Sequence, residues 1–343
     1  MKARLFIPAA LLVLLAGILM SVAAHPATYK AGPEAQSFFD RLVQPSTTSF
    51  TLTFDMGQLE AMKRSEDYYP ATFTYQGEQW EAEVKVRGRY RRRICEFPPL
   101  SLKLSKDMLR AAGLEGHNKF KLVTHCDAQL DAEDNILREQ LAYDLYHLLT
   151  GEGYRTRLVS VTYRDAVTGH TETHPAILIE DTDEMAQQLG GTECDDCAGL
   201  TYSQYVPGNP EQVALFQYLI GNSDWGTTMP RNIKVVQLQA GGRYKAVPYD
   251  FDFSGLVNAE YAKPNVNYGQ TTVTQRVWIW EFDSASQIDA VVNRFLQKEQ
   301  EVMTFVTNYP GLSNKSRRQV LNYLSACFQE FRAGDFRATV ANG

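Results

Sequence analysis

The chain of 343 residues has no internal repeat, no low-complexity tract and no excess of positive charge. Its formal net charge of −6 argues against nucleic-acid binding, because that function depends on basic surface that neutralises phosphates. The motifs GxSxG and GxxxxGK[ST] are both missing, so neither a hydrolase nucleophile elbow nor a P-loop is expected. Apolar residues make up 44% of the chain, which is enough to bury a core.

Cysteines are few and odd in number: Cys95, Cys126, Cys194, Cys197 and Cys327. An odd number leaves at least one thiol unpaired, and Cys327, in an amphipathic run, is predicted to be a buried free thiol. The CxxC at 194–197 fits a tight disulfide, half of a metal site or a redox pair. It has no second CxxC or nearby histidine, and the aspartates between the thiols would raise their pKa values. We therefore favour a structural disulfide.

One apolar run approaches the length of a membrane span, and it opens the chain. Lys2 and Arg4 precede the run at 5–22, and small residues follow it, as is typical of a secretory signal peptide over residues 1–24. The alternative is an uncleaved N-terminal anchor, which would be the chain's one link to a membrane. We expect an exported protein, periplasmic or extracellular, in a compartment that permits disulfides.

The pattern of apolar residues changes along the chain. Alternation predicts strands in SFTLTFD, ATFTYQ, WEAEVKVRG, PLSLKLS and KFKLVTH. Leu137, Leu141 and Leu145 then fall at helical spacing within 131–150, and strands resume with TRLVSVTYR and HPAILIE. A helix at PEQVALFQYLIGN, a hairpin, an aromatic-rich loop and two helices near 284–307 and 313–332 follow. The order predicts an α+β protein, β-rich first and mainly helical later.

Four polar residues are expected to meet at one end of the hairpin. The strand-like runs RNIKVVQLQ and RYKAVPYDF are separated by residues 240–242, a common loop length, and this register sets Asn232 opposite Asp250. Asp250 and Asp252 would share a strand face because they are two positions apart. The preceding loop, IGNSDWGTTMPRN, delivers Asp224 to the same end.

Carboxylate and amide oxygens are the ligands that Mg²⁺ or Mn²⁺ prefers when the phosphates of a nucleotide complete the coordination. One further acid can accept a proton from an attacking hydroxyl. We therefore interpret Asp250 and Asp252 as a metal clamp and Asp224 as the base. The alternative is a solvated hairpin end beside a turn-forming aspartate.

The segments GNSDWG, RNIKVV and PYDFDFSG, in this order and spacing, resemble the CotH (spore coat protein H-like) kinase family. Four upstream segments are also similar to parts of that family. The Arg-Gly segment of the family resembles VRGRYRRR, and its lysine-bearing strand resembles FPPLSLKL. Its helix start resembles NILREQLAYDL, and its strand ending in Glu resembles HPAILIE. The match spans about residues 84–262. It implies an atypical, two-lobed protein-kinase-like fold. The β-rich N-terminal lobe would cover 25–182 with one helix, and the mainly helical C-terminal lobe would cover 183–343 and carry the hairpin.

The resemblance also implies roles for residues of the later half. Asp224 would be the catalytic-loop aspartate. Asn232 and Asp250 would hold the metal ion, and Asp252 would support that site or bind a second ion. Glu180, at the end of a strand where the lobes would join, would lie beside the adenine of ATP or another nucleotide.

In the earlier half, Lys103 would neutralise the α- and β-phosphates, and Glu139 would be its carboxylate partner or else an exposed acid of the helix. Arg87 and Arg92 keep the family's spacing around Gly88 and would contact phosphate, or else form a cationic turn in solvent. Residues 89–91 depart from the family, because Arg, Tyr and Arg stand where small polar residues are usual. A strand carrying Lys119, Lys121 and His125 at alternating positions is predicted to present a polar sheet face instead of lining the cleft.

Together these features predict an exported kinase that transfers a nucleotide phosphoryl group to a hydroxyl of a protein or other envelope acceptor. One alternative is a degenerate kinase fold that serves as an envelope or surface binding module with a structural cation. A nucleotide-sugar transferase that uses the DFD segment as its DxD is the least favoured reading. That class would begin with a βαβ unit, whereas this chain begins with antiparallel-type strands.

Overall fold

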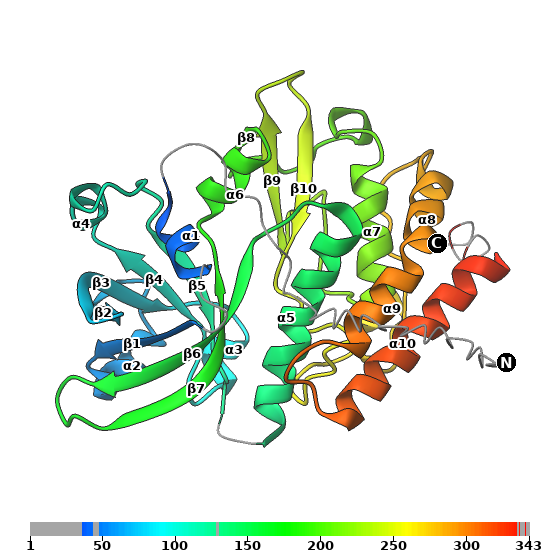
Figure 1. The fold of residues 1–343 in the computed structure, drawn as a ribbon. Helices are drawn as coiled ribbons and strands as arrows, with labels where there is room; N and C mark the ends of the chain where they lie inside the picture. The colour runs from blue at the N-terminus through cyan, green and yellow to red at the C-terminus, as the bar shows by residue number, and fades with distance from the viewer. Residues whose placement is uncertain (1–35, 44–47, 128–129, 335, 337–339, 341–343) are drawn as a thin grey trace, which may run out of the picture.

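The computed structural model describes residues 36–43, 48–127, 130–334, 336 and 340. The predicted signal peptide at 1–24 lies outside the described residues. Figure 1 shows a strand-rich half, a half formed by long helices, and a small sheet between them. The long helix α5 (Leu130–Thr150) runs through the middle of the molecule.

Seven strands of the first half close into a barrel in the order β1-β2-β3-β4-β5-β7-β6. They are β1 (Thr48–Phe54), β2 (Tyr69–Tyr75), β3 (Glu78–Val86), β4 (Leu100–Leu104), β5 (Lys119–Val123), β6 (Thr156–Asp165) and β7 (Thr171–Ile179). Alternate residues such as Leu52, Val84 and Leu102 point inward and are buried, as the period of a strand requires. The short helices beside the barrel are α1 (Phe38–Val43), α2 (Leu59–Met62), α3 (Arg91–Ile94) and α4 (Lys106–Ala111), with a 3₁₀ turn at Met56–Gln58.

This barrel overturns the prediction of a two-lobed protein-kinase-like fold. The alternating segments do form strands, but β1 also pairs in parallel with β6, from Thr48 with Val159 to Phe54 with Asp165. That pairing closes the sheet, because β1 and β6 are the first and last strands of the order; all other neighbours pair antiparallel. The general expectation of an α+β protein follows from local patterns, whereas the closure joins segments more than a hundred residues apart.

The second half packs around a core of its own. Its helices are α6 (Thr182–Gln188), α7 (Asn209–Ile220), α8 (Ile288–Gln297), α9 (Glu299–Thr307) and α10 (Asn314–Ala333), with 3₁₀ turns at Tyr202–Gln204 and Val266–Tyr268. Leu141 and Leu145 of α5 are fully buried in this second core and not in the barrel. The predicted helix at 131–150 is therefore confirmed, and it lies between the two cores.

The hairpin belongs to a three-stranded sheet of order β10-β9-β8, made of β8 (Gly191–Glu193), β9 (Ile233–Leu238) and β10 (Tyr244–Pro248). Its register pairs Pro248 with Ile233, and Tyr249 donates its N–H to the carbonyl of Asn232 at 3.0 Å. The predicted register, with Asn232 opposite Asp250, is therefore wrong by one residue. The loop has four residues between Leu238 and Arg243, which bond to each other, and it includes two glycines at positive φ.

The cysteine predictions are confirmed. Cys194 and Cys197 form a disulfide, and Cys327 is a buried free thiol. A second disulfide joins Cys95 and Cys126, 31 residues apart, which the sequence left open. Across the described residues, no helix has the length and apolar character needed to cross a membrane.

Candidate functional site

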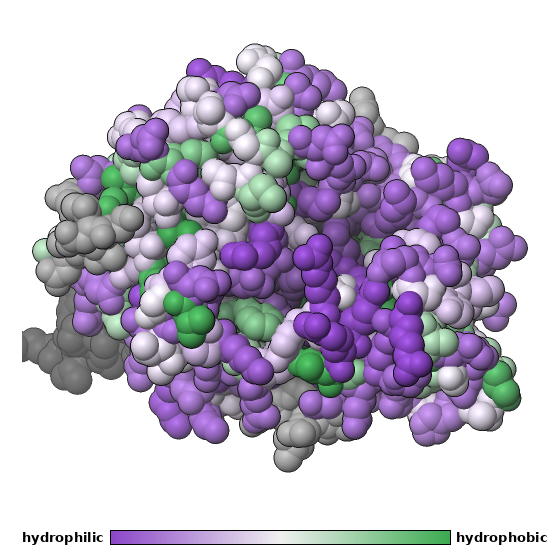
Figure 2. All heavy atoms as spheres, turned by 180° about the vertical axis from the view of Figure 1, so that it is seen from behind, coloured by the Kyte–Doolittle hydropathy of each residue, from purple (hydrophilic) through white to green (hydrophobic). Residues whose placement is uncertain are grey.

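A cleft of about 760 Å³ lies between the segment that follows β3 and the segments that flank the hairpin. It brings together Arg87, Asp224, Asn232, Asp250 and Asp252, which the sequence predicted to act together. Gly88 and residues 89–91 line the same cleft from the barrel side. Seen from behind, hydrophilic side chains cover most of the molecule and gather around a hollow near its middle (Figure 2).

The backbone at Asn232 and Asp250 is left-handed, with φ values of 51° and 63°. Non-glycine residues rarely adopt this conformation, and such residues concentrate at functional sites. Strand β10 ends at Pro248, so Asp250 and Asp252 follow the strand and do not share one of its faces. The N–H of Asp250 donates to the hydroxyl of Tyr143 on α5 at 2.8 Å, which holds the turn against the central helix.

Asn232 orients the predicted base. Its side-chain amide donates to the carbonyl oxygen of Asp224 at 2.7 Å and to its carboxylate at 3.0 Å. This leaves the amide oxygen of Asn232 for another partner. Burial, and then the charge of Asp250, raise the pKa of Asp224 above its ordinary value, although Arg231 at 3.2 Å opposes the shift. A carboxylate with a raised pKa is a better proton acceptor, as general-base catalysis requires.

Asp252 is buried beneath the cleft, next to an arginine that the sequence did not single out as functional. Its carboxylate lies 3.6 Å from the guanidinium of Arg91 and accepts a hydrogen bond from Tyr261 at 3.1 Å. Burial, and then repulsion from Asp250, raise its pKa to about 7, although Arg91 opposes the shift. A cation bound nearby would favour the charged form of this carboxyl and so lower its pKa.

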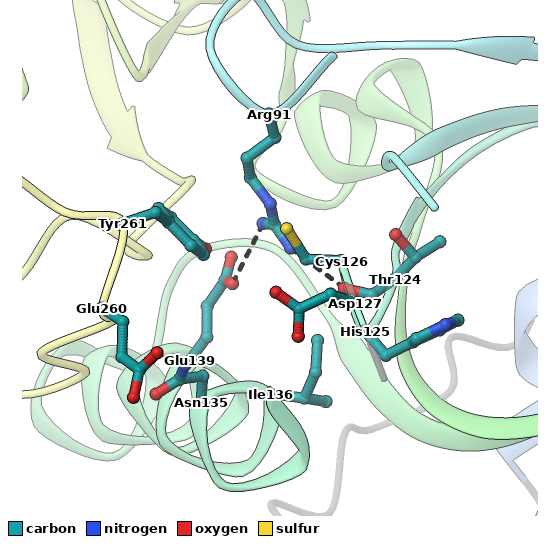
Figure 3. Close-up of a pocket in the computed structure, with 10 residues that line it drawn as sticks. All are labelled: Arg91, Thr124, His125, Cys126, Asp127, Asn135, Ile136, Glu139, Glu260 and Tyr261. Atoms are coloured by element: carbon teal, nitrogen blue, oxygen red, sulfur yellow. Dashed lines mark hydrogen bonds and ion pairs between the residues drawn. The ribbon is translucent and has the colours of Figure 1, made fainter. Parts of the chain in front are cut away.

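Arg91 occupies the centre of this region (Figure 3). It is buried, donates to the carbonyl oxygen of Thr124 at 3.0 Å, lies 3.5 Å from Glu139 and sits over the ring of Tyr261. Burial raises the pKa of Glu139, and Arg91 opposes that shift. Among the described residues, Oε1 of Glu139 and Nε of Arg91 are buried without a hydrogen-bond partner. The run of arginines around Arg91 was the available signal, but it was interpreted as a departure from the family pattern.

Lys103 and Arg92 do not line the cleft. Lys103 pairs with Glu83 at 2.6 Å on the neighbouring strand, so Glu139 faces Arg91 and not Lys103 as predicted. Arg92 pairs with Glu66 at 2.5 Å and donates to the carbonyl of Val86 at 2.8 Å. By contrast, no carboxylate of the described residues lies within ion-pair distance of Arg87, so its guanidinium is available to a ligand.

Glu180 lies in an internal ion-pair network instead of the cleft. It is fully buried and accepts from the guanidinium of Arg155 at 2.7 Å and from Gln188 at 3.0 Å. Burial raises its pKa, and Arg155 opposes the shift. Arg155 also pairs with Asp40 at 2.6 Å and with Glu184.

Lys121, on the strand predicted to present a polar face, is half-buried and does not line the cleft. Its ammonium donates to Thr182 at 2.6 Å and lies 4.5 Å from the centroid of the Tyr154 ring, which in turn contacts the cleft residue Tyr249. Burial, and then the charge of Arg87, lower its pKa to about 7. Lys119 is exposed, as the prediction requires, and His125 is buried.

Comparison with known proteins identifies no family. No protein-family model matches the chain, and the curated proteins contain no match to it. The chain is weakly similar to the solved structure of the proinflammatory kinase CtkA of Helicobacter pylori, with 10% identity and a TM-score of 0.37. The alignment covers 70% of this chain and 92% of that one. This likeness is too weak to carry an argument about activity, and the resemblance to the CotH family stays a prediction.

Proposed function

We propose that the cleft binds a nucleotide such as ATP with Mg²⁺ or Mn²⁺ and transfers a phosphoryl group to a hydroxyl of a protein or other envelope acceptor. The observation that carries this proposal is the convergence of Asp224, Asn232, Asp250 and Asp252 on one cleft beside Arg87. These donors are all oxygens of the kind that hard divalent cations prefer. A cation held by these residues would supply positive charge that offsets the charge of the phosphates.

The residues of the chain would divide the remaining work. Asp250, Asp252 and the amide oxygen of Asn232 would hold the cation. Arg87, which lines the cleft without an ion-pair partner among the described residues, would contact phosphate through its planar guanidinium. Asp224 would take the proton of the acceptor hydroxyl. The oxygen of that hydroxyl would attack the terminal phosphorus of the nucleotide, and the bond from this phosphorus to the nucleoside diphosphate would break.

Thermal unfolding with Mg²⁺ or Mn²⁺, with and without ATP, tests this proposal. A ligand at a hundred times its Kd should stabilise the chain by about 2.7 kcal/mol, because it binds the folded state alone. We expect a rise in melting temperature that requires both cation and ATP and is lost in Asp250→Ala. Asp107→Ala is the matched control, since it removes an exposed carboxylate on α4 outside the cleft. A rise that persists in Asp250→Ala would refute the assignment.

A cation-binding module without turnover is the second candidate function. It is favoured by one observation: Lys103, the lysine that the resemblance assigns to phosphate, is paired with Glu83 outside the cleft. In that case the melting temperature would rise with cation alone and would not respond to ATP. Transfer of labelled phosphate from ATP to the chain itself or to an envelope fraction would exclude this candidate.

We further propose that the protein acts outside the cytoplasm, in the periplasm or beyond. The two disulfides, Cys95–Cys126 and Cys194–Cys197, support this location, because such bonds persist in oxidising compartments. Fractionation of cells that express the full chain should recover it there with residues 1–24 removed. Recovery of an unprocessed chain with reduced thiols in the cytoplasm would contradict the proposal.

A further inference from the structure

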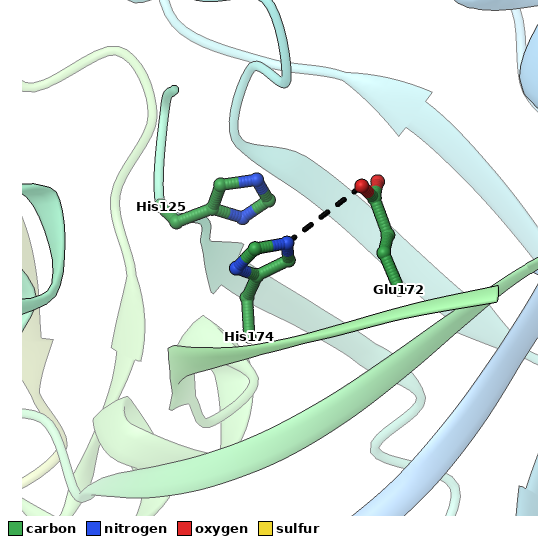
Figure 4. Close-up of side chains that lie close together, drawn as sticks. All are labelled: His125, Glu172 and His174. Atoms are coloured by element: carbon green, nitrogen blue, oxygen red, sulfur yellow. Dashed lines mark ion pairs between the residues drawn. The ribbon is translucent and has the colours of Figure 1, made fainter. Parts of the chain in front are cut away.

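A second cluster of potential ligands lies at one end of the barrel, apart from the oxygen donors of the cleft. It consists of His125, which follows β5, and of Glu172 and His174 on β7. One ligand atom from each residue can be chosen so that all three lie within 4.8 Å of one another. In Figure 4 the two imidazole rings lie face to face, and the carboxylate of Glu172 is directed at the edge of the His174 ring.

The strand register explains how Glu172 and His174 come together. They are two positions apart on β7, so they share a face. Their partners on β6 are Tyr163 and Val161, both buried in the barrel core, so this face points to the barrel interior. Glu172 and His174 remain partly exposed, which places the cluster where the interior opens to solvent.

His125 is held in place from the other side. The disulfide between Cys95 and Cys126 and the hydrogen bond from the N–H of Phe97 to the carbonyl of Cys126, at 2.9 Å, anchor its backbone. Its ring stacks on Phe97, with centroids 5.2 Å apart, and on His174, with centroids 3.7 Å apart. The rotation of the ring is therefore restricted, as a preformed ligand requires.

A purely structural role leaves one feature of the cluster unexplained. His125 is only 5% exposed, and among the described residues its Nδ1 atom is buried without a hydrogen-bond partner. Leaving a buried polar atom without a partner lowers the stability of the folded state. Glu172 lies 3.7 Å from Nε2 of His174, which is longer than a hydrogen bond. All three side chains thus retain ligand atoms that a bound ion would satisfy.

We propose that His125, Glu172 and His174 bind a transition-metal ion of the Zn²⁺ type, with three protein ligands and a fourth position open to water or another ligand. Two imidazoles and one carboxylate form a donor set that suits Zn²⁺, whereas the all-oxygen cleft suits Mg²⁺ or Mn²⁺. In a tetrahedral zinc site the ligand atoms are about 3.3 Å apart, given metal–ligand bonds of about 2.0–2.1 Å. The ligand atoms must therefore draw together from their present limit of 4.8 Å when the ion binds.

Titration of the metal-free full chain with Co²⁺, followed by competition with Zn²⁺, tests this site. We expect one equivalent of Co²⁺ to bind with the visible absorption of tetrahedral cobalt and to be displaced by Zn²⁺. His174→Ala should weaken Co²⁺ binding by more than about 100-fold, and Glu172→Gln by more than about 10-fold. Loss of an outer-sphere partner alone typically costs 10–100-fold in metal affinity, and both variants change a direct ligand. Thermal unfolding without metal checks that both variants are folded.

Two controls separate this site from others. His170→Ala removes an exposed histidine from the same β6–β7 hairpin and should leave Co²⁺ affinity unchanged. Asp250→Ala should also bind Co²⁺ normally, so this result does not depend on the proposed phosphotransferase site. Absence of stoichiometric binding, or an affinity that His174→Ala and Glu172→Gln leave unaltered, would overturn the proposal. The cluster would then be a ring stack that closes the end of the barrel.

Discussion

Two buried arginines, Arg155 and Arg91, each face several carboxylates, but their contacts differ. Arg155 donates hydrogen bonds to Asp40 at 2.6 Å, to Glu180 at 2.7 Å and to Glu184. Arg91 lies 3.5 Å from Glu139 and 3.6 Å from Asp252, and it donates a hydrogen bond to the backbone carbonyl of Thr124 instead. Arg155 is hydrogen-bonded to all three of its acids. Arg91 forms no such bond with Glu139 or Asp252, so these acids can accept another partner.

The comparison separates charges that are fully paired inside the protein from charges that line the cleft. Charge and burial alone do not make this distinction, because both arginines are buried among carboxylates. The hydrogen bonds and the position of the cleft distinguish the two arginines. Arg91 and Asp252 line the cleft, whereas Arg155 and Glu180 do not. Glu180 was predicted to lie beside a nucleotide, and its place in the Arg155 network indicates a role in stability.

The largest expected effect comes from breaking the Arg155 network. Arg155→Met leaves Glu180 and Glu184 buried without their cation, and loss of one partner of a buried pair typically costs about 3–5 kcal/mol. Denaturant unfolding would measure this loss in the free energy of unfolding. A loss below about 1 kcal/mol would remove the contrast between the two arginines.

Replacing Arg91 should have a smaller effect on stability and a distinct effect on ligand binding. We expect Arg91→Met to lose about 1–3 kcal/mol, the range for a buried polar group left unsatisfied, because Arg91 lies 3.5 and 3.6 Å from Glu139 and Asp252 and donates its hydrogen bond to a backbone carbonyl instead. The variant should also bind Mg²⁺ more tightly, since a competing cation is gone. Calorimetric titration with Mg²⁺ checks this, with Arg110→Met, an exposed arginine outside the cleft, as control. Weaker Mg²⁺ binding by Arg91→Met would contradict the argument.

A further buried acid, Asp144, accepts hydrogen bonds from neutral donors, and its protonation should make the free energy of unfolding depend on pH. Asp144 on α5 accepts from Tyr309 at 2.6 Å and from Gln140 at 3.1 Å, and burial raises its pKa to about 6. The folded state then binds the proton more tightly than the unfolded state. This contribution to stability is complete below the unfolded pKa of 3.8 and is lost as pH rises through about 6.

The expected result is a difference in slope between two proteins. From about pH 4 to 6, the free energy of unfolding of the parent protein should include a decline, of up to about 1.4 kcal/mol per pH unit, that Asp144→Asn lacks. Unfolding curves collected across this range for both proteins measure it. Parallel pH profiles would show that the carboxyl of Asp144 does not titrate in this window.

The smallest effect is expected at Lys103. Its pair with Glu83 is more than one-third exposed on both sides, and exposed pairs contribute about 0–1 kcal/mol. Lys103→Met should therefore change the free energy of unfolding by less than about 1 kcal/mol and leave the rise in melting temperature with Mg²⁺ and ATP intact. Loss of that rise would show that Lys103 leaves Glu83 to contact the nucleotide.

Features that depend on neighbouring residues could be predicted from the sequence. The leucines of 131–150 predict α5, the CxxC predicts the disulfide at 194–197, and the alternating runs predict the strands. The grouping of Asp224, Asn232, Asp250 and Asp252 in one cleft also follows from their nearness along the chain. The error of one residue in the register did not disturb it, because the segments still meet at the same end of the hairpin.

Tertiary structure alone decided the features that join distant segments. The barrel closes through β1 and β6, Arg91 meets Glu139 and Asp252, and His125 meets Glu172 and His174. Local propensity carries no information about such pairings, because the sequence around each of these residues is equally compatible with an exposed strand or turn. Which distant segments meet depends on how the barrel and the helical core bury their apolar surface together, and that is a property of the whole chain.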